Sequence, residues 1–164
     1  MVRKAIEGLQ HQKAQREHTL TLDIAADLPP LLGNPLRLQQ MVANLVGNAI
    51  KYTPSRGHIR VSLWRDGDNL VLQVADNGIG IPAEDQPYVF DKFFRSERAA
   101  SEYDGTGLGL SIVKGVVDQH RGRIWLESRE NVGTTFTVVL PLSPANPDPD
   151  PTRPRRTTGR LVAP

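Results

Sequence analysis

The sequence contains no cysteine, and this absence excludes disulfide scaffolds, thiolate zinc sites and cysteine nucleophiles together. No stretch approaches the ~20 apolar residues of a membrane span, and residues 1–7 lack the apolar run of a signal peptide. The pattern G-x-x-x-x-G-K-[ST] occurs nowhere, and the run Gly105-Thr106-Gly107 lacks the third glycine of a dinucleotide fingerprint. We therefore expect a soluble region that holds any phosphate by another arrangement.

The chain also has little excess of either charge, because its net charge is only +2. Residues 144–164 alone supply the excess, with four arginines, and they also hold six of the thirteen prolines but few large apolar side chains. Such a composition buries too little surface to offset its ordering entropy. We predict a disordered tail over 144–164, and we attribute the basic pI to this tail instead of to nucleic-acid binding.

Hydrophobic periodicity predicts the order of helices and strands. Asn34 before Pro35 is typical of a helix start. The predicted elements are a helix over about 2–16, a strand over 20–24, a long helix to about Tyr52, a hairpin over 59–74, a helix over about 108–119 and a hairpin over 123–140. This order predicts an α+β fold, with a mixed sheet covered by helices on one face. Residues 81–104 show no period and are expected to be structureless.

The long helix carries an unusual polar stripe over Asn44 to Thr53. Residues four and seven apart share a helix face, so Asn44, Asn48 and Lys51 lie together beside an apolar stripe. Amide oxygens and an ammonium group suit a metal ion and a phosphate better than a core. Asn44 alone is equally compatible with an ordinary helix surface.

Two glycine-containing segments add chemistry at element ends. Asp76-Asn77-Gly78-Ile79-Gly80 follows a strand, where a carboxylate can accept a ligand N–H and glycines permit close approach. Gly105-Thr106-Gly107-Leu108-Gly109 opens a helix, whose free N–H groups attract phosphate. Alone, the first is also consistent with a simple acidic turn, and the second with glycines that only punctuate a loop.

Together these segments closely resemble the ATP-binding catalytic domain of sensor histidine kinases, within the gyrase, chaperone and histidine-kinase ATP-binding superfamily. The order and spacing also match in Phe90-Asp91-Lys92-Phe93-Phe94-Arg95 and in Gly133-Thr134-Thr135-Phe136. The resemblance spans Leu20 to Leu140 and covers the N box, both glycine boxes and the phenylalanine box. It implies a two-layer α/β sandwich with a mostly antiparallel sheet and a nucleotide lid over 81–104. The expected domain is 19–143, after a helix or linker over 1–18.

The resemblance also implies ATP and Mg²⁺ as cofactors, and a role for each matching residue. Asn48 would bind Mg²⁺, and Asn44 would support the metal and the triphosphate. Lys51 would contact a phosphate, and Arg95 would contact the γ-phosphate. The catalytic residues would be Asn48, Lys51 and Arg95. Tyr52, Asp76, Gly78, Gly80 and Thr134 would surround adenine, and Gly105, Thr106, Gly107, Leu108 and Gly109 would cradle phosphates.

Several aromatic and basic residues have plainer interpretations. Phe90, Phe93 and Phe94 fit a lid or an ordinary core, and Lys92 and Arg95 fit a solvated surface. Trp64 and Trp125 are expected in packing.

The resemblance favours phosphoryl transfer to a histidine. Relatives that hydrolyse ATP or phosphorylate serine place a glutamate base four residues before the metal-binding asparagine, and here that residue is Asn44. None of the four histidines, His11, His18, His58 and His120, precedes an acidic residue as a phosphoacceptor of the family does. The implied partners are a dimerisation and phosphoacceptor domain, on the same or a separate polypeptide, and indirectly a response regulator, in the cytoplasm. A non-catalytic ATP-sensing module and, last, a gyrase-type ATPase remain as alternatives.

Overall fold

The computed structural model describes residues 2–9 and 16–142. Its elements are α1 (Val2–Glu7), β1 (Thr19–Ile24), α3 (Pro35–Tyr52), β2 (His58–Asp66), β3 (Asn69–Asp76), the 3-10 helix η1 (Gln86–Tyr88), α4 (Glu97–Glu102), α5 (Gly109–Gln119), β4 (Arg123–Arg129) and β5 (Gly133–Pro141). In the described part of the chain, no helix is both long and apolar enough to cross a membrane. The tail predicted for 144–164 and His11 lie outside the described residues.

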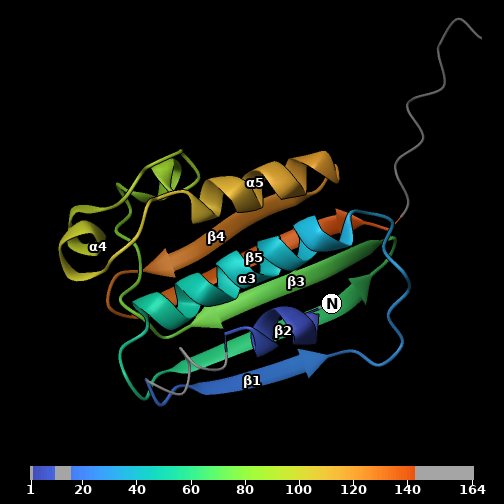
Figure 1. Ribbon diagram of the computed structural model, residues 1–164, viewed down its shortest axis with the longest axis horizontal. Coiled ribbons are helices and arrows are strands. Elements are labelled where there is room, and N and C mark those ends of the chain that lie inside the picture. Colours follow the sequence, from blue (N-terminus) through green and yellow to red (C-terminus); the bar gives the residue numbers. More distant parts are fainter. Residues whose placement is uncertain (1, 10–15, 143–164) are drawn as a thin grey trace, which may run out of the picture.

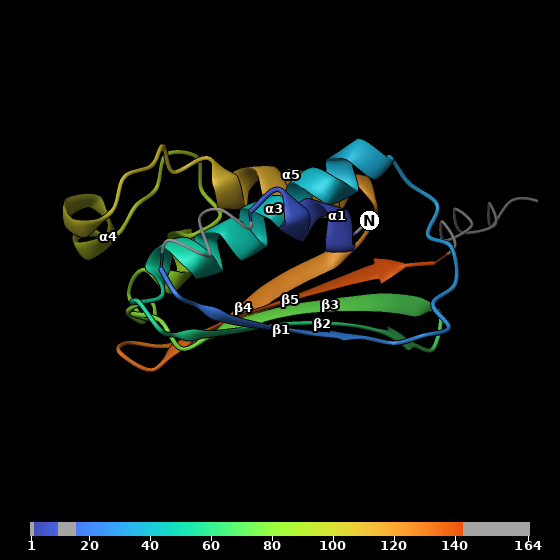
Figure 2. The same cartoon turned by 60° about the horizontal axis from the view of Figure 1, so that its bottom comes forward.

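The strands form one five-stranded sheet in the order β1-β2-β3-β5-β4. β1 and β2 are parallel and are joined through α3, while the other neighbours are antiparallel. Helices α1, α3 and α5 cover one face (Figures 1 and 2). The α+β fold and the mixed, mostly antiparallel sheet with helices on one face are therefore confirmed.

The core lies between the sheet and the helices α3 and α5. Val42, Val46, Val61, Val113 and Val138 are fully buried there. The apolar stripe of α3 and the alternating residues of β2 and β3 face each other, as helix and strand periodicity require. Asn34 begins α3 as expected, because its side chain accepts the backbone N–H groups of Leu36 and Arg37.

Three expectations about elements were wrong. The helix predicted over 2–16 is interrupted, because α1 ends at Glu7 and Gly8 and Leu9 form a turn; residues 10–15 of the predicted range lie outside the described residues. Residues 81–104 contain η1 and α4, which are too short to produce a visible period. Trp64 and Trp125 lie outside the core, where they retain 36% and 43% exposure, because alternation places them on the uncovered face of the sheet.

Candidate functional site

A cavity of about 510 Å³ opens between α3, the N-terminus of α5, the end of β3 and residues 79–107. Its lining includes every predicted site residue except Gly78: Asn44, Asn48, Lys51, Tyr52, Asp76, Gly80, Arg95, Gly105, Thr106, Gly107, Leu108, Gly109 and Thr134. The apolar part of the wall includes Phe94 and Phe136, which lie in motifs noted in the sequence. Its other members were not singled out there: Ala49, Ile79, Ile81, Val89, Ala99, Leu110 and Ile112. The cavity thus combines an apolar wall with a small set of polar groups, as ligand sites usually do.

The two asparagines of α3 face the start of α5. Asn44 Oδ1 and Asn48 Oδ1 lie 3.9 and 3.8 Å from the position that a Cβ on Gly109 would occupy. Asn44 Nδ2 is buried and has no hydrogen-bond partner among the residues that the structure describes. A buried amide without a partner is costly, and a ligand in the cavity would remove that cost. The pair therefore offers oxygen ligands and one free donor to whatever fills the space beside Gly109.

Lys51 brings a positive charge to the same end of the cavity. Its Nζ donates to the Tyr52 hydroxyl at 3.0 Å and lies 4.6 Å from the centroid of that ring. A Cβ on Gly105 would lie only 2.5 Å from Nζ, so the glycine turn passes directly over the ammonium group. Lys51 makes no ion pair with any residue that the structure describes. Its charge is therefore available to an anion.

The glycine-rich segment ends in a helix start that no side chain caps. Gly105 and Gly107 have φ values of +154° and +70°, which only glycine adopts easily. Leu108 precedes α5 and provides no side-chain hydrogen bond to the first N–H groups of the helix. Free N–H groups and the positive end of the helix dipole together attract anions.

Asp76, at the end of β3, also lines the cavity and has one carboxylate oxygen available for a ligand. Its Oδ1 accepts the backbone N–H groups of Gly78 at 2.9 Å and Thr134 at 3.3 Å. No hydrogen bond within the described residues reaches Oδ2. Burial raises the pKa of this carboxyl from 3.8 to about 6, although both N–H bonds oppose the rise. The group is nevertheless ionised at neutral pH and presents a strong acceptor.

Gly78 does not line the cavity, but its backbone N–H donates to Asp76 Oδ1. A Cβ there would lie 2.5 Å from the Tyr52 carbonyl oxygen, so the residue lets the turn pack against the end of α3. Gly78 was predicted to contact the nucleotide, but it is not among the residues that line the cavity.

The aromatic residues of the phenylalanine box have three different environments. Phe90 packs edge-to-face on Phe136 of the core at 6.4 Å, and Phe94 lines the cavity and contacts Tyr88 at 5.8 Å. Phe93 is 70% exposed. The lid and core interpretations thus apply to different members of the box.

Arg95 organises the segment before the glycine turn. Its guanidinium donates to the carbonyls of Gly105 at 3.1 Å and Ala99 at 2.6 Å, and also to that of Tyr103. Its Nε is buried and has no hydrogen-bond partner within the described part of the chain. In this arrangement Arg95 holds α4 and the glycine turn together at the edge of the cavity.

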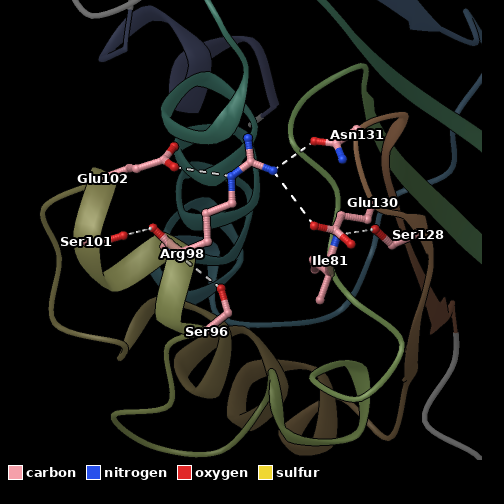
Figure 3. Close-up of polar contacts among 9 residues, drawn as sticks. Ile81, Ser96, Arg98, Ser101, Glu102, Ser128, Glu130 and Asn131 are labelled. Carbon is pink, nitrogen blue, oxygen red and sulfur yellow. Dashed lines mark hydrogen bonds and ion pairs between the residues drawn. The ribbon is translucent and has the colours of Figure 1, made fainter.

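Arg98 joins α4 to the turn between β4 and β5 (Figure 3). Its Nη1 donates to Asn131 Oδ1 at 2.8 Å and lies 3.9 Å from Glu130 Oε1, while its Nε donates to Glu102 Oε1 at 3.3 Å. We call this group of four side chains the α4 clasp. Sequence reasoning missed it, because its members lie up to 33 positions apart and match no motif.

The described histidines lie away from the cavity. His18 is buried, and its Nε2 contacts the carbonyl oxygens of Thr53 at 3.0 Å and Pro54 at 3.1 Å. His120 contacts the Val116 carbonyl through Nδ1 at 2.7 Å, and His58 is exposed on β2. None of these three lines the cavity.

Comparison with known proteins places the chain among ATP-binding domains. Residues 33–144 match the family described as histidine kinase-, DNA gyrase B- and HSP90-like ATPases. The adaptive-response sensory kinase SasA of Synechocystis sp. is 37% identical over 143 residues, covering 87% of this chain and 37% of SasA. The sensor-like histidine kinase SenX3 of Mycobacterium tuberculosis is 43% identical over 139 residues, covering 82% of this chain and 34% of SenX3. The chain thus spans about a third of each of these relatives.

Solved structures show the same fold. The catalytic domain of histidine kinase ThkA superposes with a TM-score of 0.76 at 28% identity, covering 87% of this chain and 92% of that domain. ThkA in complex with the response regulator protein TrrA gives a TM-score of 0.71 at 25% identity, covering 87% of this chain and 39% of that chain.

Proposed function

Since this chain belongs to the family of histidine kinase-, DNA gyrase B- and HSP90-like ATPases, we propose that it is the Mg-ATP-binding catalytic domain of a two-component histidine kinase. The γ-phosphate of ATP would pass to a histidine on a dimerisation and phosphoacceptor domain, in trans if that domain is a separate polypeptide. The proposed catalytic domain is 19–143, with residues 1–18 as a helix or linker.

The Asp76 end of the cavity fits adenine. Asp76 Oδ2 would accept the 6-amino hydrogen of the base, and Thr134 would complete the recognition. The apolar wall, including Ile79 and Phe136, would cover the ring faces, and Tyr52 would lie at the base edge. A carboxylate acceptor beside apolar side chains suits adenine, because the base has flat apolar faces and an amino group that donates hydrogen bonds.

The α3–α5 end of the cavity fits Mg²⁺ and a triphosphate. Asn48 Oδ1 is an oxygen ligand of the kind that Mg²⁺ prefers. Asn44, one turn earlier, adds the buried Nδ2, which has no hydrogen-bond partner in residues 2–9 and 16–142. The ion would neutralise phosphate charge. Lys51 and the backbone of Gly105–Gly109 would hold the phosphates, and Arg95, which lines the same cavity, would contact the γ-phosphate.

The identity of residue 44, an asparagine, favours transfer to histidine over hydrolysis. The relatives that activate water or a serine hydroxyl do so through a glutamate at this position, and the only carboxylates among the cavity-lining residues are Asp76 and Asp104. A neutral imidazole nitrogen needs no base, because its lone pair is already nucleophilic. Its nitrogen would form the new N–P bond while the bond from the γ-phosphorus to the bridging oxygen breaks and that oxygen leaves with ADP.

The proposed partners follow from the same reaction. The acceptor is a histidine of a dimerisation domain, and a response regulator would then receive the phosphate from that histidine; the ThkA complex with TrrA supports this partner class. A cytoplasmic location is proposed with them.

The test mixes the protein with Mg²⁺, γ-labelled ATP and a separately supplied phosphoacceptor domain of a relative. We expect an acid-labile label on the acceptor histidine and none on this chain. Asn48→Ala should abolish the transfer, whereas Gln40→Ala, on the exposed side of the same helix, should leave it unchanged. Steady phosphate release without an acceptor would indicate an ATPase instead, and tight ATP binding without any transfer would indicate a sensing module.

A further inference from the structure

Ser128, near the end of β4, makes three polar contacts through one hydroxyl oxygen. Its Oγ lies 2.8 Å from Ile81 N, 3.1 Å from Gly133 O and 2.8 Å from Thr134 Oγ1. Ile81 opens the lid segment, and Ser128 lies against it beside the β4–β5 turn (Figure 3). Ser128 itself does not line the cavity, whereas Thr134 does. One side chain therefore connects the root of the lid to the wall of the nucleotide site.

Taken together, these three contacts allow a direction to be assigned to both hydroxyl groups. The Ile81 N–H can only donate and the Gly133 carbonyl can only accept, so Ser128 accepts the first and donates its single proton to the second. Either hydroxyl could be the donor in the third contact, and we take Thr134 as its donor because the single Ser128 proton is directed to Gly133. Thr134 Oγ1 is thus left with lone pairs, and no proton, for the cavity.

Asp76 provides a second hydrogen-bond acceptor beside Thr134 Oγ1. Asp76 and Thr134 are directly opposite each other on β3 and β5, and Asp76 Oδ1 is occupied by backbone N–H groups, which leaves Oδ2 as an acceptor. Two neighbouring acceptors match the 6-amino group of adenine and oppose the 6-oxo group of hypoxanthine.

We propose that Ser128 is a specificity-determining positioning residue: by fixing the Thr134 hydroxyl as an acceptor, it makes the cavity select a 6-amino purine over a 6-oxo purine. The proposal rests on the adenine site proposed above and adds a residue that controls the site without touching the nucleotide. Without Ser128, the Thr134 hydroxyl is free to turn and donate towards a 6-oxo base.

A purely structural role makes a different prediction. Removal of the Ser128 hydroxyl also deprives Ile81 N–H of its acceptor, which would loosen the lid and weaken every nucleotide by the same factor. The ratio of two dissociation constants therefore separates the roles, whereas a single affinity does not.

The experiment measures dissociation constants of Mg-ATP and Mg-ITP for the wild type, Ser128→Ala, Ser128→Cys and Ser128→Thr. We expect the ratio of the dissociation constant of Mg-ITP to that of Mg-ATP to fall about three- to tenfold in Ser128→Ala, which corresponds to the loss of one neutral hydrogen bond. The same ratio should also fall in Ser128→Cys. Ser128→Thr keeps the hydroxyl and should restore the ratio, and Ser62→Ala, on the uncovered face of the sheet, should leave it unchanged.

An unchanged ratio in Ser128→Ala and Ser128→Cys, with both affinities reduced equally, would overturn the proposal and leave the proposed function intact. A wild type that binds neither nucleotide would overturn the proposed function as well. Ser128→Cys keeps the test decisive if the alanine variant does not fold.

Discussion

Replacement of Asp76 by asparagine should make the protein more stable and a poorer binder of ATP. Burial raises the pKa of the carboxyl from 3.8 to about 6, so the ionised form costs the folded state free energy. Each pKa unit corresponds to about 1.36 kcal/mol, so this cost is about 3 kcal/mol at neutral pH. Asparagine carries no charge and keeps an oxygen for the N–H groups of Gly78 and Thr134.

The sign of the pH dependence follows from the raised pKa. Below about pH 3 the carboxyl is protonated in both folded and unfolded states, and the cost is absent. The wild type loses this stability as the pH rises from about 4 to about 6, and the loss is complete above that range. The difference in free energy of unfolding between Asp76→Asn and the wild type should therefore grow from about 0.5 kcal/mol at pH 4 to about 3 kcal/mol at pH 7.

The binding effect has the opposite sign. With Oδ1 still held by the two N–H groups, the new Nδ2 takes the place of Oδ2 and directs a donor at the amino donor of adenine. We expect ATP affinity to fall by at least tenfold, and affinity for a guanine nucleotide to fall much less, because guanine carries an acceptor at that position.

Urea unfolding across pH 4–7.5 and calorimetric titration of both nucleotides measure the two effects. A variant that is less stable at pH 7, or that binds ATP within twofold of the wild type, would refute the assignment of Asp76.

Three further changes test other parts of the site. Asn48→Ala should abolish Mg²⁺-dependent ATP binding without changing the thermal midpoint, and Gln40→Ala should change neither; retained metal dependence would remove Asn48 from the metal site. Arg98→Ala breaks the α4 clasp, and we expect faster proteolysis of residues 96–104 and up to about tenfold weaker ATP binding; unchanged cleavage would show that the clasp does not order α4. Gly80→Ala should cost at least about 2 kcal/mol in urea unfolding, because φ is +68° and a Cβ would overlap the Arg129 carbonyl; a cost under 0.5 kcal/mol would contradict this reason.

The features that the sequence predicted well depend on neighbouring residues. Asn34 before Pro35 placed the start of α3, because the capping bonds join residues two and three positions apart. Alternation over 59–74 identified the β2–β3 hairpin, since each strand has one covered face. The spacing of Asn44, Asn48 and Lys51 likewise placed all three on one cavity wall.

The features that it missed depend on contacts between distant segments. Ser128 meets Ile81 across 47 positions, and Arg98 meets Asn131 across 33, so no local pattern announces either contact. The short helix α4 begins at a local cap, Ser96, but it has too few residues for a hydrophobic period. The exposure of Trp64 and Trp125 follows from which sheet face lacks helices, and composition does not reveal that.

The fate of the γ-phosphate in a single turnover tests the central claim most directly. The protein, in excess over labelled Mg-ATP, is mixed with a separate phosphoacceptor domain, and label is counted on the domain and in solution. Because Asn44 stands where a glutamate base would activate water, we predict that the label accumulates on a histidine of the acceptor, with little free phosphate when the acceptor is omitted. Release of free phosphate at the same rate with and without the acceptor would contradict the account.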